Sequence, residues 1–188
     1  MDPGEPADND NLDRLRDLAA GLGATLGTGD VLAWVSLGDS DAIPAEVYAV
    51  VSNVGLFGQG DPGSPAQTRR QAAGVGQGAG QPVILPADGP ALMSLTWEID
   101  EPTAIDLLTS LAGSGGSGAK RHHLRRRYAV DPGDVFAELA ALIGPDTRWW
   151  TNTDLTRWNP ITQHTFDAIV IGAGNGVIVT LIAFEGGG

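Results

Sequence analysis

Apolar side chains recur three and four positions apart in three segments, the spacing of a helix with one buried face. These segments begin near residues 11, 101 and 132. Their apolar positions are Leu12, Leu15, Leu18, Ala19 and Leu22 in the first, Ala104, Ile105, Leu108 and Ala112 in the second, and Val135, Phe136, Leu139, Ala140 and Ile143 in the third. The pattern therefore predicts three amphipathic helices.

The residues at the ends of these segments are typical of helix boundaries. Asp10 or Asn11 can cap the first helix, and the glycines between residues 21 and 29 are expected to end it. Asp131 can cap the third helix, and Pro132 suits its first turn because proline lacks the N–H that would be unpaired there. The third helix has the strongest boundary signals in the chain.

Runs rich in β-branched and aromatic residues predict strands between these helices. The runs are Val31 to Leu37 (VLAWVSL), Glu46 to Ser52 (EVYAVVS) and Ala91 to Glu98 (ALMSLTWE). In the second run the valines at 47, 50, 51 and 54 also have helical spacing, so a helix is the alternative there.

The chain ends in "DAIVIGAGNGVIVTLIAFEGGG", residues 167 to 188. Its glycines are spaced Gly-x-Gly-x-Gly, whereas a dinucleotide-binding loop needs Gly-x-Gly-x-x-Gly at the start of a helix. The pair Asn175-Gly176 is favoured in the two-residue turn of a β-hairpin. We therefore predict a hairpin and no cofactor.

Apolar residues occur on both faces of this predicted hairpin. We expect one face to carry Ile169, Ile171, Val177, Val179 and Leu181 and the other to carry Val170, Ile178, Ile182 and Phe184. A strand that is apolar on both faces lies inside a sheet that is covered on both sides.

Helices and strands do not alternate regularly, which predicts an α+β fold with a largely antiparallel sheet, about three flanking helices and a C-terminal β-hairpin. At 188 residues the chain is expected to form a flexible acidic tail (1–10) and a single domain (11–188). Gly-rich composition predicts mobile loops at 58–90 and at 113–123, the latter containing the linker-like sequence GSGGSG.

The charge of the chain favours some partners over others. Twenty-three acidic residues against eleven basic ones give a net charge of −12. Such a surface repels nucleic acid and anionic membranes and attracts a basic protein. The chain has no cysteine, no apolar run of membrane-spanning length and an acidic start unlike a secretion signal, so a cytoplasmic location is expected.

The segment 148–167 combines aromatic and polar residues as binding surfaces do. The candidate partner-binding residues are Trp149, Trp150, Asn152, Asp154, Arg157 and Trp158. On a strand Trp149 and Trp150 would face opposite sides, so one of them should be substantially exposed, with Arg157 or Trp158 beside it. The alternative is that the tryptophans simply pack in the core.

Catalytic chemistry has little support in the sequence. His164 and Asp167 are candidates for a catalytic pair, although residues three apart on a strand face opposite sides and would need a turn between them. Three histidines without cysteine offer no recognised metal-binding motif, so no metal is expected.

A short basic run contains five of the eleven positive charges, namely Lys120, Arg121, Arg125, Arg126 and Arg127. It could contact phosphates, but a basic loop neutralised by the protein's own acidic surface is the simpler interpretation.

The leading hypothesis is a small acidic protein that binds a basic protein partner, such as an immunity-type inhibitor of a basic toxin or nuclease. One alternative is a small enzyme or ligand-binding domain that uses the Trp-rich segment 149–167. A second alternative is a nucleic-acid-associated protein that uses the basic run 120–128.

Overall fold

The computed structural model describes residues 9–26, 31–53, 86–113, 131–162 and 167–184. Within these ranges five helices and five strands form an α+β fold with an antiparallel sheet, which confirms the predicted fold class and the closing hairpin. The helices are α1 (Asn9–Leu26), α2 (Ile43–Asn53), α4 (Gly89–Met93), α5 (Glu101–Gly113) and α7 (Pro132–Ile143). The strands are β1 (Val31–Leu37), β2 (Trp97–Ile99), β3 (Arg148–Thr151), β4 (Asp167–Gly174) and β5 (Val177–Phe184).

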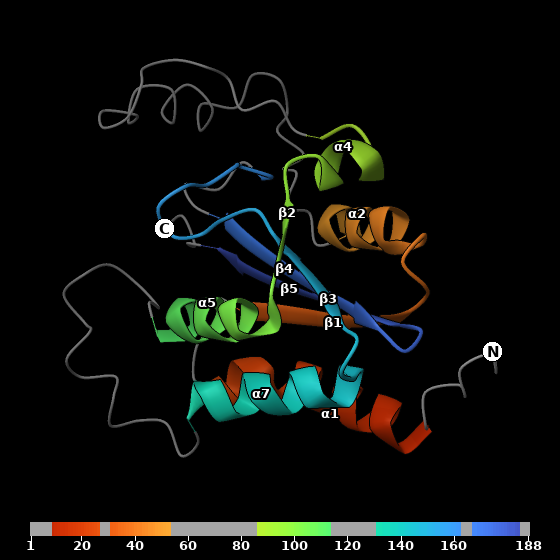
Figure 1. The fold of residues 1–188 in the computed structure, drawn as a ribbon, viewed down its shortest axis with the longest axis vertical. Coiled ribbons are helices and arrows are strands. Elements are labelled where there is room, and N and C mark those ends of the chain that lie inside the picture. The colour runs from red at the N-terminus through yellow and green to blue at the C-terminus, as the bar shows by residue number, and fades with distance from the viewer. Residues whose placement is uncertain (1–8, 27–30, 54–85, 114–130, 163–166, 185–188) are drawn as a thin grey trace.

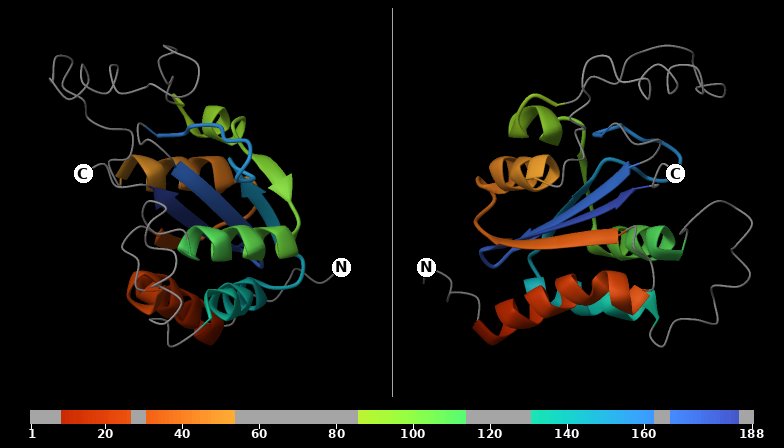
Figure 2. Two further views of the ribbon diagram at one scale, coloured as in Figure 1. Left: turned by 90° about the vertical axis from the view of Figure 1, so that its left-hand side faces the viewer. Right: turned by 180° about the vertical axis from the view of Figure 1, so that it is seen from behind.

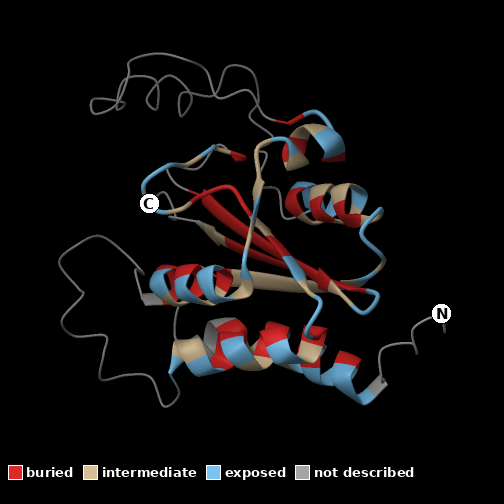
Figure 3. Ribbon diagram, viewed as in Figure 1, coloured by how far each residue is buried: buried red, intermediate tan, exposed pale blue. Residues whose placement is uncertain are grey.

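The sheet has the strand order β1-β5-β4-β3-β2, so the hairpin strands β4 and β5 lie inside it. Helices α1, α5 and α7 cover one face, and α2 and α4 cover the other (Figures 1 and 2). Buried residues line the helix surfaces that face the sheet and fill the inner strands (Figure 3). The predicted position of the hairpin, between two covered faces, is confirmed.

The hairpin turn has the predicted conformation. Asn175 (φ 49°) and Gly176 (φ 75°) both have positive φ, as the tight turn requires. The expected grouping of the faces was wrong, because the two-residue turn pairs Ile169 with Ile182 and so places them on one face. The side facing α2 and α4 carries Ile169, Ile171, Ile178 and Ile182, and the side facing the other helices carries Val170, Val177, Val179 and Leu181.

The three predicted helices are present as α1, α5 and α7, and β1 spans the predicted residues. Of the glycines expected to end the first helix, Gly21 and Gly23 lie inside it, and α1 ends at Leu26, directly before Gly27. A glycine inside a helix costs only about 1 kcal/mol, and the buried Leu22 between these two glycines offsets that cost. The helix also begins at Asn9, before the predicted caps.

The strand predicted at residues 46–52 was wrong, because this segment lies within helix α2. Ile43, Val47 and Val51, spaced four residues apart, form its buried stripe against the sheet. Asp39 stabilises the chain just before the helix, its carboxylate accepting hydrogen bonds from the amides of Asp41 and Ala42. Helical periodicity therefore outweighed the strand preference of the valines.

The strand predicted at residues 91–98 was also wrong over most of its length. The short helix α4 occupies its first three residues, and β2 shares only Trp97 and Glu98 with it. Asp88 caps α4 by accepting a hydrogen bond from the amide of Ala91, and Pro90 lies in its first turn. These are the same boundary signals that predicted α7.

Most of the predicted tail and mobile loops fall outside the described residues: 1–8, 54–85 and 114–130.

Candidate functional site

The buried carboxylate of Asp167, at the start of β4, organises the loop that follows β3. It accepts hydrogen bonds from Asn152 Nδ2 (2.9 Å), Trp158 Nε1 (3.1 Å), the amide of Ile161 (3.2 Å), and both the amide and the hydroxyl of Thr162 (2.6 Å each). Five donors surround the two oxygens, so this carboxylate fixes the loop 152–162 in place. His164 lies outside the described residues, and its predicted pairing with Asp167 lies there too.

Asn152 ties the same loop to the sheet. Its Nδ2 also donates to the carbonyl of Asn159 (2.9 Å), and its Oδ1 accepts from the amide of Ile169 (2.7 Å). The side chain is fully buried. Asn152 is therefore a structural residue that joins the loop to β4.

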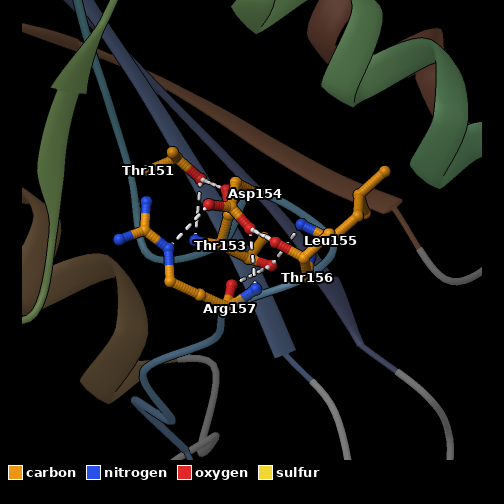
Figure 4. A network of polar contacts seen from close by, with 6 residues as sticks. All are labelled: Thr151, Thr153, Asp154, Leu155, Thr156 and Arg157. Carbon is orange, nitrogen blue, oxygen red and sulfur yellow. Dashed lines mark hydrogen bonds and ion pairs between the residues drawn. The ribbon is translucent and has the colours of Figure 1, made fainter.

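Residues 153–157, which we name the Asp154 turn, form a hydrogen-bonded turn within this loop (Figure 4). The Asp154 carboxylate accepts hydrogen bonds from the amide (2.9 Å) and hydroxyl (2.6 Å) of Thr156 and from the amide (2.6 Å) and Nε (2.9 Å) of Arg157. These donors, the Thr156 hydroxyl first, hold the pKa of Asp154 well below its usual value. The turn is thus held together by one ionised carboxylate.

Leu155 sits at the tip of the Asp154 turn in a conformation that leucine seldom adopts. Its φ is 69°, and 53% of its surface is exposed. Its amide donates to Thr153 Oγ1 (3.1 Å), whose hydroxyl in turn donates to the carbonyl of Arg157 (3.1 Å) (Figure 4). The turn therefore presents an apolar side chain to solvent in a fixed position.

A small hollow separates α5 from the Asp154 turn. Its lining combines side chains from β2, α5 and the turn: Ile99, Thr103, Asp106, Leu107, Ser110, Thr153, Asp154 and Leu155. Its volume is about 190 Å³, whereas sites for small molecules usually measure about 300–1,000 Å³. The hollow is large enough for one side chain of a partner.

Trp149 and Trp150 face opposite sides of the sheet, as predicted. Trp149 is 1% exposed and packs over Gly172 on the side of α1, α5 and α7. Trp150 packs on the side of α2 and is half-buried, where substantial exposure was expected. The guanidinium of Arg148 lies 4.9 Å from the centre of a Trp150 ring, and its hydrogen bonds to Glu98 hold it there.

The six predicted partner-binding residues therefore lie in three environments. Trp149 and Trp150 belong to the two faces of the sheet, Asn152 and Trp158 to the hydrogen-bond network of Asp167, and Asp154 and Arg157 to the exposed turn. Arg157 also lies 5.7 Å from the ring centre of Trp97. Of the six predicted residues, only Asp154 lines the hollow.

Sequence reasoning did not single out Asp106 or Leu155 as site residues. Two signals were available. Asp106 lies on the polar side of a predicted helix, and the sequence Asp154-Leu-Thr-Arg157 is typical of a turn closed by an aspartate side chain. Neither signal shows that the helix and the turn lie side by side.

The arginines of the described residues are all paired with carboxylates. The pairs are Arg14–Glu138, Arg16–Asp13, Arg148–Glu98 and Arg157–Asp154. The same ranges contain seventeen carboxylate side chains, so thirteen of them have no ion-pair partner there and the net charge is −13. The basic run 120–127 lies outside these ranges.

Comparison with known proteins yields no family model, curated protein or solved structure that matches the chain. Within the described ranges no three His, Asp or Glu side chains are grouped so that they could hold a metal ion. None of the helices described is long and apolar enough to cross a membrane.

Proposed function

We propose that this chain is an acidic binding protein that occupies the surface of a basic protein. The charge balance carries the proposal: each described arginine is already matched by a carboxylate, and twelve further carboxylates, not counting the buried Asp167, are left to act on a partner. A field of one sign accelerates the encounter with an oppositely charged protein and disfavours anionic competitors.

Within this proposal, the specific form is an immunity-type inhibitor of a basic toxin or nuclease in the cytoplasm. Surfaces that bind nucleic acid are rich in lysine and arginine, and a rigid acidic protein can cover such a surface in place of the phosphates. The alternative of an enzyme or small-molecule site in residues 149–167 gains less support. The oxygens of Asp167 are surrounded by structural donors, and the hollow is small.

The test uses the basic proteins, with pI above about 9, that are encoded beside the gene of this protein. Each is purified and titrated with the full chain by calorimetry, and any nuclease activity is measured during the titration. We expect one of them to form a one-to-one complex that weakens with added salt and to lose its activity at equal molar amounts. If none binds at low salt, where electrostatic attraction is strongest, the proposal is wrong.

A further inference from the structure

We propose that the hollow between α5 and the Asp154 turn is the contact site for the basic partner, and that it receives one arginine or lysine side chain. This inference rests on the proposed function and adds the site and the chemistry of recognition.

The first reason is the charge of the hollow. Two carboxylates line it, Asp154 and Asp106. Asp154 is already paired with Arg157, whereas exposed Asp106 forms no ion pair with any described residue. A cation that enters the hollow therefore meets one unmatched carboxylate, while an anion meets two negative charges.

The second reason is the apolar part of the lining. Ile99, Leu107 and Leu155 contribute hydrocarbon surface, while Asp106 and Thr103 of α5 contribute oxygens. Arginine and lysine match such a site, because their long stems pack on apolar groups while the charged end reaches a carboxylate. A short polar or a purely apolar side chain would satisfy only one part of the lining.

The third reason is Leu155 itself. Its positive φ costs a non-glycine residue about 1–2 kcal/mol, and its exposure forgoes most of the gain from burial. Leucine thus contributes little to the stability of the folded monomer at this position, where glycine or asparagine would fit the backbone better. A contact with a partner would bury Leu155, and the rigid turn lowers the entropy lost on binding.

The experiment measures this recognition without the natural partner. The full chain, labelled at its methyl groups, is titrated with N-acetyl-arginine amide up to about 50 mM, a range suited to the millimolar affinities of such small probes. N-acetyl-lysine amide is the second probe. N-acetyl-citrulline amide is the control, because it has nearly the shape of the arginine compound without the charge.

We expect both cationic probes to shift the methyl resonances of Ile99, Leu107 and Leu155, with citrulline at least about threefold weaker. The substitution Asp106→Asn should weaken the binding of the arginine probe by a similar factor. The matched control Asp146→Asn, an exposed carboxylate at the other end of β3, should not. Shifts centred elsewhere, or equal binding of arginine and citrulline, would overturn the proposal.

Binding measurements with the natural partner test this inference separately from the proposed function. Leu155→Gly should bind that partner at least about tenfold more weakly, as a contact residue does, while the melting temperature stays equal or rises. If the wild type binds a basic partner and both Leu155→Gly and Asp106→Asn bind it equally well, the site is wrong and the function stands. If no basic partner binds, the function is wrong, and the probe titration still decides whether the hollow selects cations.

Discussion

At the scale of single residues, the approach of Trp149 to Gly172 shows how tightly the core is packed. A Cβ atom added to Gly172 would lie 2.6 Å from Cζ3 of the Trp149 ring. Gly172→Ala should therefore lower the free energy of unfolding by about 1–3 kcal/mol, as overpacking of a core does, measured by urea denaturation.

A double-mutant cycle identifies the cause of that loss. Phenylalanine at position 149 lacks the outer ring atoms that the new methyl group would meet. The effect of Gly172→Ala should therefore be much smaller in the Trp149→Phe background. Equal effects in both backgrounds would show that the glycine is needed for another reason.

Asp167 gives a prediction that separates structure from catalysis. Asp167→Asn replaces an oxygen acceptor by an amide group that meets the N–H donors around it, leaving buried donors unpaired. We expect a loss of at least about 3 kcal/mol in the free energy of unfolding. The exposed Asp146→Asn is the control and should change stability by less than about 0.5 kcal/mol. If the Asp167 variant is as stable as the wild type, the structural role of Asp167 is wrong and a catalytic role must be tested.

The sequence predicts the candidate site only in part at this scale. Asp154 and Arg157 were among the predicted contact residues, because charged residues beside tryptophans suggest a surface. The hollow also depends on Asp106, which lies 48 positions from Asp154 and reaches the turn only through the packing of α5 on the sheet. Such long-range placement has no local signal.

At the scale of elements, the turn between β4 and β5 also stabilises the end of α7. Asn175 adopts a positive φ and donates from Nδ2 to the carbonyl of Ile143 (2.9 Å). Asn175→Gly keeps the backbone conformation and loses the hydrogen bond, at a cost of about 1 kcal/mol. Asn175→Ala loses both, and should cost about 2 kcal/mol. Thermal or urea unfolding that ranks the two variants in the opposite order would contradict this account.

The Asp154 turn should depend on pH in a defined direction. Because the folded pKa of Asp154 lies below its ordinary value of 3.8, its ionised form contributes stability that is fully present above about pH 4. That contribution is lost as the pH falls through the folded pKa. The amide resonance of Leu155 should therefore titrate with a midpoint below 3.8 and should not titrate in this way in Asp154→Asn. A midpoint at or above 3.8 would contradict the hydrogen-bond network.

The elements that the sequence predicted correctly are those whose local signals agree with one another. For α7, the capping Asp131, Pro132 and the apolar stripe all predict the same helix. For α2, the β-branched residues favoured a strand and their spacing favoured a helix, and packing against the second face of the sheet decided the outcome. β2 is only three residues long, too short for alternation to be visible.

At the scale of the whole molecule, the proposed function assigns separate tasks to charge and to direct contact. The unmatched carboxylates are spread over α1, α2, α5 and α7, and attraction to a partner extends about 10 Å at 0.1 M salt. In the proposed complex, the hollow and Leu155 act only once the partner touches them. The proposed function therefore requires that changes in distant charge and changes in the hollow alter different rate constants.

This separation can be measured with two variants of the full chain and the basic partner. The triple variant Asp39→Asn, Asp41→Asn, Glu46→Gln removes three charges near α2, and the side-chain oxygen of asparagine at position 39 can still accept the hydrogen bonds from the amides of residues 41 and 42. We expect it to slow association several-fold at low salt and to flatten the salt dependence of the association rate, with little change in dissociation. Leu155→Gly should instead speed dissociation and leave the salt dependence unchanged. Surface plasmon resonance at several salt concentrations measures both rates. If the triple variant accelerates dissociation as much as Leu155→Gly does, the residues near α2 are part of the contact surface and the assignment of the hollow as its centre is wrong.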